Sequence, residues 1–197
     1  GGINVGTAQI AVYGERGIFM PAAATGYTTN DYINIKKIGG TGNYRQYEVH
    51  MNVVVDDGNY SSGNLLGSTD ILKVGSGYTA TIDELNNSND KGYSGAKIIN
   101  EGSLIVSENG DSNVPLYLKE GELVNKGIMI LRGNVGIDKD SEATVYGATV
   151  TNEKTLKLYG KINSVTNNGT IAIMDEGAVI NSRTGSGTVD ISAVADE

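Results

Sequence analysis

The chain has 197 residues, and its composition excludes several classes of protein before any motif is considered. It contains no cysteine, no tryptophan and one histidine, which rules out disulfide frameworks and cysteine-based zinc or iron–sulfur sites. The formal net charge of −8 disfavours nucleic acid and anionic lipid as partners. The longest apolar stretch, residues 18–24, is far shorter than the roughly 20 residues of a membrane-spanning helix.

Short alternating runs of apolar and polar residues predict strands along the whole chain. Residues 156–158 (Leu-Lys-Leu) and 171–173 (Ile-Ala-Ile) show the two-residue period of a strand with one buried face. The runs are separated by turn-forming residues, since the chain holds 28 glycines and 20 asparagines. The best helical candidate is residues 81–85, with Asp83 and Glu84 near its start. The sequence therefore predicts an all-β protein of many short strands.

The first half of the chain, residues 1–97, is predicted to be a β-rich segment with irregular loops. Tyrosines gather in it, and an arginine lies between two of them. Tyr and Arg are enriched at binding surfaces because they combine contact area with a polar tip. The alternative is that these rings cover exposed strands or cap the fold. The candidates for ligand contact are Tyr44, Arg45, Tyr47 and Tyr60.

Few residues of the chain are candidates for catalysis or metal binding. His50 has no Gly-x-Ser-x-Gly nucleophile elbow to serve, so it is interpreted as a polar residue on the solvent face of a strand. The acidic pairs 56–57 and 175–176 could act on glycosides, but neighbours on a strand point to opposite faces and each pair precedes a turn-forming Gly. Segments 108–113 and 138–142 collect oxygen ligands suited to Ca²⁺ without the spacing of a known calcium loop. We therefore expect no catalytic residue, no metal and no cofactor.

The second half, residues 98–197, is predicted to be a regular array of repeats. Each of five segments has a pair with at least one aliphatic residue, then Asn, then usually x-Gly, then an alternating strand. The asparagines are 25, 27, 15 and 14 positions apart, which favours a solenoid with variable loops over a propeller. They are Asn100, Asn125, Asn152, Asn167 and Asn181.

The chemistry of the motif predicts that it forms the corners of stacked coils. Gly and Asn are the residues that most easily adopt the left-handed backbone that such a corner often needs. An inward Asn can bond to the backbone and to the Asn of the next coil, because stacked strands lie about 4.8 Å apart. We therefore expect the five asparagines to form a structural ladder, with the aliphatic residues beside them covered by the neighbouring coils.

These units resemble those of the passenger domains of large type V autotransporter adhesins. The Asn-x-Gly-x-aliphatic-x-aliphatic unit recurs through residues 98–191, and residues 3–14 (Ile-Asn-Val-Gly-Thr-Ala-Gln-Ile-Ala-Val-Tyr-Gly) are similar to a second unit of these passengers. Residues 27–97 fit either unit poorly. The resemblance implies a right-handed parallel β-helix (a solenoid) with irregular loops or an insertion in its N-terminal half. It also implies an extracellular place on the bacterial cell surface, with membrane attachment only through a translocator domain that these 197 residues lack.

Three hypotheses about function follow. In the first, a stiff rod presents loops that bind a host surface protein, a glycan or a partner bacterial cell, without enzymatic activity. In the second, the chain is a β-helical polysaccharide hydrolase or lyase similar to a phage tailspike, with carboxylates on consecutive coils lining a groove. In the third, the chain is a spacer and the binding residues lie elsewhere in a longer protein. The resemblance favours the adhesin.

Overall fold

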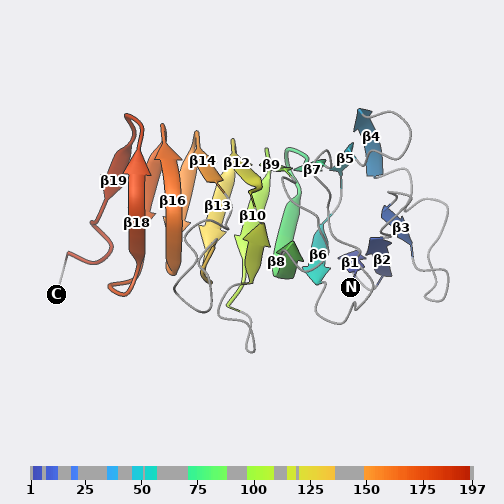
Figure 1. Cartoon of the computed structure of the whole chain (residues 1–197), viewed down its shortest axis with the longest axis horizontal. Coiled ribbons are helices and arrows are strands. Elements are labelled where there is room, and N and C mark those ends of the chain that lie inside the picture. The colour runs from blue at the N-terminus through green and yellow to red at the C-terminus, as the bar shows by residue number, and fades with distance from the viewer. Residues whose placement is uncertain are drawn as a thin grey trace.

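The described part of the chain is built of β-strands, seen here in a computed structural model. It comprises residues 2–5, 8–12, 19–21, 35–39, 46–50, 52–56, 71–87, 97–108, 115–118, 120–135 and 149–195. Within these residues there is no helix, and hence none long and apolar enough to cross a membrane. The strands stand side by side along one axis, so the molecule is elongated (Figure 1).

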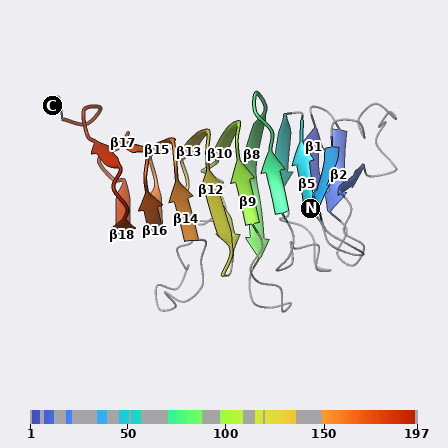
Figure 2. The same ribbon diagram turned by 90° about the horizontal axis from the view of Figure 1, so that it is seen from above.

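Two long sheets run the length of the molecule and share the chain between them (Figure 2). The first sheet contains β1 (Gly2–Val5), β2 (Ala8–Val12), β3 (Phe19–Pro21), β6 (Val53–Asp56), β8 (Thr79–Asn87), β10 (Ser103–Val106), β13 (Ile128–Leu131), β15 (Thr155–Leu158), β17 (Thr170–Ile173) and β19 (Thr188–Asp190). The second contains β4 (Ile35–Gly39), β5 (Gln46–Val49), β7 (Ile71–Val74), β9 (Lys97–Asn100), β12 (Glu122–Asn125), β14 (Thr149–Asn152), β16 (Lys161–Asn167) and β18 (Val179–Thr184).

From β5 and β6 onward, the described strands of both sheets pair in parallel. In the second sheet the order is β5, β7, β9, β12, β14, β16 and β18, and in the first it is β6, β8, β10, β13, β15, β17 and β19. The chain passes from a strand of the second sheet to the next strand of the first sheet and then returns to the second sheet, one position further along the axis. Each such circuit is one coil of a solenoid-like stack. The antiparallel strands β1 to β4 lie at the N-terminal end of this stack.

A third, shorter side closes the coils. Strand β11 (Leu116–Leu118) pairs in parallel with the C-terminal part of β8. Single parallel bridges then join Leu116 to Val135 and Val135 to Ile162, and Ile162 is in register with Ile180 of β18. Strands β8, β16 and β18 are long because each of them spans this third side and one of the two sheets.

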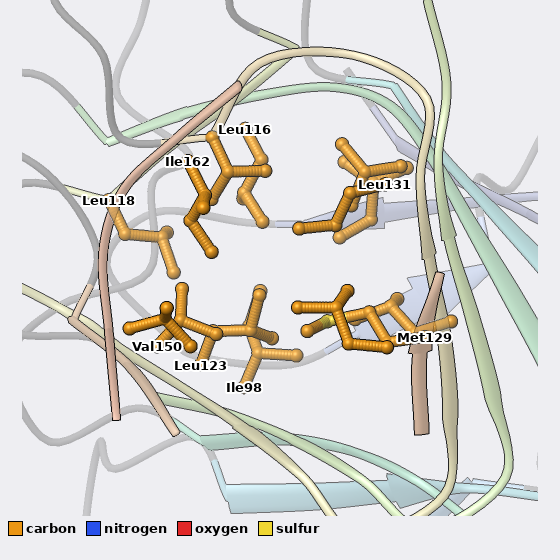
Figure 3. Close-up of a cluster of buried hydrophobic side chains, with 14 of the residues drawn as sticks. Ile98, Leu116, Leu118, Leu123, Met129, Leu131, Val150 and Ile162 are labelled. Atoms are coloured by element: carbon orange, nitrogen blue, oxygen red, sulfur yellow. The ribbon is translucent and has the colours of Figure 1, made fainter. Parts of the chain in front are cut away.

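The interior of the stack is filled by aliphatic side chains from all three sides (Figure 3). Residues in register stack in columns, and Ile98, Leu123 and Val150 form one such column from β9, β12 and β14. Met129 and Leu131 of β13 face them across the coil. These side chains are fully buried, and burial of each contributes roughly 1.5–3 kcal/mol. One coil has no room for a core of its own, so each column is covered by the coils on either side of it.

Two sequence-based expectations meet the structure here. Residues 81–85, the best helical candidate of the sequence, lie within strand β8, in agreement with the all-β prediction. The pairing of Thr81 with both Val54 and Ile105 outweighs the local preference of the acidic residues for a helix. Parallel pairing also runs without a break from β7 to β9, across the boundary expected at residues 97 and 98.

Candidate functional site

The most distinctive polar feature of the molecule is a row of buried asparagines at one corner of the coils. The amide nitrogen of Asn100 donates to Oδ1 of Asn125, that of Asn125 to Oδ1 of Asn152, and that of Asn152 to Oδ1 of Asn167, each at 2.8 Å. All four side chains are fully buried. Register explains the row, because each asparagine ends a strand of the second sheet and pairs with the next one.

Each of these amides also donates a hydrogen to the backbone of the next coil, and for Asn100, Asn125 and Asn152 this is the second hydrogen of the amide. The acceptors are the carbonyl oxygens of Ile128, Thr155, Thr170 and Thr188, at 2.8–3.1 Å. Each acceptor begins the strand of the first sheet that follows the corner, so the amide fixes where that strand starts. A buried amide that uses both of its hydrogens leaves neither donor unpaired, which would otherwise cost about 1–3 kcal/mol.

The row ends where its neighbours in register are not asparagines. Val74 pairs with Asn100, and the Oδ1 atom of Asn100 is buried without a hydrogen-bond partner because a valine cannot donate to it. At the other end, Asn167 is followed by Gly185, whose backbone lies against it.

The expectation that Asn181 belongs to the ladder is wrong. Asn181 is exposed, and its amide bonds to Oδ1 of Asn163 at 3.4 Å on the outside of the stack. The physical reason is the length of β16 and β18, which span the third side and the second sheet. The corner therefore comes four residues after Asn181, at Gly185.

The corner glycines have a different role from the one expected. Among described glycines only Gly77 and Gly185 have a positive φ, so the x-Gly part of the motif does not supply a left-handed backbone. Instead, a Cβ atom on Gly127 would collide with the carbonyl oxygen of Gly102, and one on Gly169 with that of Lys154. Glycine is needed here because successive corners stack with their backbones in direct contact.

Two further asparagines join neighbouring coils and were missed from the sequence. Oδ1 of Asn52 accepts from the backbone N–H of Thr79, and Oδ1 of Asn134 accepts from that of Lys161, each at 3.0 Å. In both cases the partner lies 27 residues further along the chain. Each of these asparagines precedes a valine, and this shared Asn-Val dipeptide was the signal in the sequence that the two positions are equivalent.

A charged cluster joins three coils near the N-terminal end of the described stack. Nζ of Lys73 lies 3.2 Å from a carboxylate oxygen of Glu48 and 3.0 Å from one of Glu101. Nε2 of His50 lies 2.7 Å from Glu48, and the His50 ring stacks on Tyr78 with centroids 5.6 Å apart. These contacts place His50 in a structural cluster, on a partly buried position.

The same contacts set the charge of the cluster. Burial tends to raise the pKa of Glu48, but hydrogen bonds from His50 and Lys73 and their positive charge outweigh it and leave that pKa below its ordinary value. The hydrogen bond to Glu101, opposed by burial and helped by Glu48, raises the pKa of Lys73. Glu48 is therefore held ionised, which does not suit a general acid.

The expected ligand-contact residues are mostly outside the described part of the chain. Tyr44, Arg45 and Tyr60 are outside the described residues. Tyr47 lies on β5, in register with Leu72 of β7. Among the described residues, no group of three or more His, Asp or Glu side chains is placed to hold a metal ion.

The expected acidic turn is present at 175–176. Oδ1 of Asp175 accepts from the backbone N–H of Gly177 at 2.7 Å, so this carboxylate stabilises a turn. The pair at 56–57 is described only in part, since Asp56 ends β6 and Asp57 lies outside the described residues. Segment 138–142 and most of segment 108–113 also lie outside them.

The outward positions of the second sheet change in character along the axis. In one column Glu48 and Lys73 are followed by Ile99 and Val124, and then by Thr151, Thr166 and Thr184. The hydroxyl oxygens of Thr166 and Thr184 lie 3.1 Å apart, and those of Thr170 and Thr188 on the first sheet lie 3.2 Å apart. This column is thus charged and then aliphatic over the earlier coils and carries hydroxyl groups over the later ones.

Comparisons with protein-family models, with curated proteins and with solved structures found no match to this chain.

Proposed function

We propose that the chain is a segment of a bacterial cell-surface adhesin, built as a right-handed parallel β-helix that presents its outer surface and loops to a partner. The observation that carries the proposal is the parallel stack of coils fastened through Asn100, Asn125, Asn152 and Asn167. The right hand follows from the general rule that crossovers between parallel strands are right-handed in nearly all proteins. The resemblance of the sequence units to autotransporter passengers supplies the cellular setting.

The stack supports this role through its stiffness. Successive coils are joined by strand pairing, by the buried amide row and by ion pairs such as Lys97 with Glu122, at 3.0 Å. Each coil advances the structure by about 4.8 Å, the spacing between strands in a sheet. A rod of this kind holds binding residues away from the cell and keeps their spacing constant, so that weak contacts on successive coils add up.

Five of the described carboxylates are held in ion pairs or turns, which makes these five poor candidates for catalysis. Glu48 and Glu101 share Lys73, and Glu122 pairs with Lys97. Asp175 and Asp190 each accept a hydrogen bond from a backbone N–H two residues later. A glycosidase needs one carboxyl group that is protonated and free to act as the acid. This favours an adhesin, with a host surface protein, a glycan or a partner bacterial cell as the ligand.

A cell-binding assay tests the proposal. The fluorescently labelled chain is titrated onto host epithelial cells, onto bacterial cells and onto an array of glycans, and saturable binding to at least one of them is expected. A variant with Thr166→Lys and Thr184→Lys changes the outer surface without touching the interior and shows whether the hydroxyl-rich face takes part.

The same protein is incubated with complex polysaccharides as a second arm. Release of new reducing ends or unsaturated sugars would mean a hydrolase or lyase and would contradict the proposal. Absence of saturable binding to every cell type and glycan would contradict it as well and would favour the spacer.

A further inference from the structure

The outward face of the second sheet carries hydroxyl groups at the same places on three neighbouring strands, β14, β16 and β18 (Figure 2). On each strand two hydroxyl residues flank one inward position, which on β14 and β16 is a buried valine. The six residues of this hydroxyl face are Thr149, Thr151, Ser164, Thr166, Ser182 and Thr184. Strand pairing sets them in two columns along the axis. The columns point away from the axis, so a coil stacked on β18 would lengthen them and leave them open.

The six positions of the hydroxyl face carry no charge, in contrast to the strands before them. The column of Thr149 contains Lys97 and Glu122 on β9 and β12, and these two form an ion pair at 3.0 Å. Beside the hydroxyl groups, Nδ2 of Asn181 lies 3.4 Å from Oδ1 of Asn163, which adds neutral amides. An ionic ligand bound here would lose water and meet no opposite charge at these positions, so a neutral ligand is favoured.

Hydrogen bonding within the hydroxyl face leaves it rich in acceptors. The hydroxyl oxygens of Thr166 and Thr184 lie 3.1 Å apart, so one of them donates to the other. A hydroxyl group has one hydrogen to donate and two lone pairs that accept, so more lone pairs than hydrogens remain for a ligand. A ligand with many O–H donors therefore fits better than a phosphate, a sulfate or a carboxylate, which only accept when ionised. The net charge of −8 also disfavours anions.

The columns repeat at a distance that suits an extended sugar chain. Neighbouring strands lie about 4.8 Å apart, so the hydroxyl groups recur at that interval along the axis. The buried amides of Asn152 and Asn167, each one residue after a threonine of the face, bond at 2.8 Å and hold these strands in register. A polymer of β-linked hexoses in its extended form advances by nearly the same distance with each sugar. Such a chain laid along the axis therefore meets one coil with each sugar.

From the absence of charge, the surplus of acceptors and the spacing we infer that the hydroxyl face binds a neutral polysaccharide of β-linked hexoses, extended along the axis of the stack. The inference rests on the proposed function, and it names the class of ligand and the face that binds it. The sugar hydroxyls donate to the threonine and serine oxygens of successive coils. Each contact is weak, and contacts on successive coils add up.

Three sugar hexamers test the inference on the full chain. Cellohexaose is neutral, β-linked and extended, the hexamer of β-linked glucuronic acid has the same backbone but is anionic, and maltohexaose is neutral but α-linked and curved. Each is titrated into the isotope-labelled chain at physiological ionic strength, and the resonances of residues 149–151, 164–166 and 182–184 are followed. Cellohexaose is expected to shift these resonances and to bind about tenfold more tightly than either of the other hexamers.

Two matched double variants locate the site. Thr149→Val with Thr151→Val removes both outward hydroxyl groups of β14, and valine keeps the shape and the strand preference of threonine. Thr79→Val with Thr81→Val does the same on β8 of the first sheet, on either side of the buried Ala80. The β14 variant should bind cellohexaose about tenfold more weakly than wild type, and the β8 variant should bind it as wild type does. Both should keep the wild-type melting temperature, which is measured alongside.

Three results would overturn the inference: no shift of the hydroxyl-face resonances with cellohexaose, equal affinity of the three hexamers, or equal loss of affinity in both double variants. If the chain still binds cells or glycans in the assay proposed above, the adhesin stands and only the ligand class and the face assigned here are wrong. Failure to bind cellohexaose and every cell type and glycan contradicts both proposals.

Discussion

The coils from β9 to β17 and the coil of β18 and β19 follow the same register but differ in what covers them. Ile171 and Val189 occupy the same inward column, and one is fully buried while the other is 37% exposed. At the corner, Asn167 donates across to the next coil, where Gly185 has no side chain with which to continue the row. The difference teaches that an inward side chain is fully buried only where the next coil covers it. Its own sequence pattern therefore does not predict how deeply it is buried.

The largest effect on the free energy of unfolding is expected from truncating Ile171, which is fully buried, rather than Val189 in the same column. Ile171→Ala should lower the free energy of unfolding by about 3 kcal/mol, because it leaves a cavity between two coils. Val189→Ala should lower it by less than about 1 kcal/mol, because its side chain is already in partial contact with water. Denaturant unfolding of both variants measures the difference. Equal losses would mean that the last coil is covered as well as the others.

The ladder gives the next largest effect. Asn125→Ala should lower the free energy of unfolding by about 2 kcal/mol, since the amide of Asn100 and Oδ1 of Asn152 would lose their partner while buried. Asn181→Ala is the matched control on the exposed surface and should stay within about 0.5 kcal/mol of wild type. If the two substitutions cost the same in urea unfolding, the buried row is not a source of stability.

A smaller effect is expected where the row begins. Val74→Asn places an amide beside the unpaired Oδ1 of Asn100, while Val74→Ala leaves that atom as it is. Both variants lose the buried valine, so their difference measures the new hydrogen bond less the cost of burying the amide of the introduced asparagine. The Asn variant should be more stable than the Ala variant by about 1 kcal/mol in thermal unfolding. An Asn variant less stable than the Ala variant would show that the acceptor is satisfied in another way.

The charged cluster predicts the smallest effect, and it depends on pH. The pKa of Glu48 is lowered from 4.5 in the folded chain, so its contribution is present above that value and is lost as the pH falls below it. Glu48→Gln should therefore be less stable than wild type by about 1 kcal/mol at neutral pH, and the gap should close on acidification. Unfolding curves of both proteins from pH 7 down to pH 3 measure it. A gap independent of pH would mean that the charge of Glu48 plays no part.

Much of this fold follows from local pattern, and the errors have a common cause. Alternation places the strands, and the Asn motif places the corners at Asn100, Asn125, Asn152 and Asn167, because each ends a strand of the second sheet. The Asn181 assignment failed because Asn181 lies near the start of β18, on the third side, and the corner after that strand comes four residues later at Gly185. The repeated segments 162–166 (Ile-Asn-Ser-Val-Thr) and 180–184 (Ile-Asn-Ser-Arg-Thr) contain the missing signal, since they align Asn181 with Asn163.

The charged cluster and the corner glycines were beyond sequence reasoning for a different reason. Glu48, Lys73 and Glu101 are about one coil apart, and no local spacing relates them until the register is known. Gly127 is required by contact with Gly102 of the previous coil, which a conformational argument about a single residue misses. Both features depend on the distance between coils, so they became visible only with the stack assembled.

Exchange of side-chain amide hydrogens, followed by NMR, tests the buried row most directly. The amides of Asn125 and Asn152 each donate both hydrogens inside the stack, whereas Asn181 is exposed. The account predicts that the first two exchange at least about a hundredfold more slowly than Asn181. Exchange of Asn125 and Asn152 at the rate of Asn181 would contradict the stacked coils on which every proposal here depends.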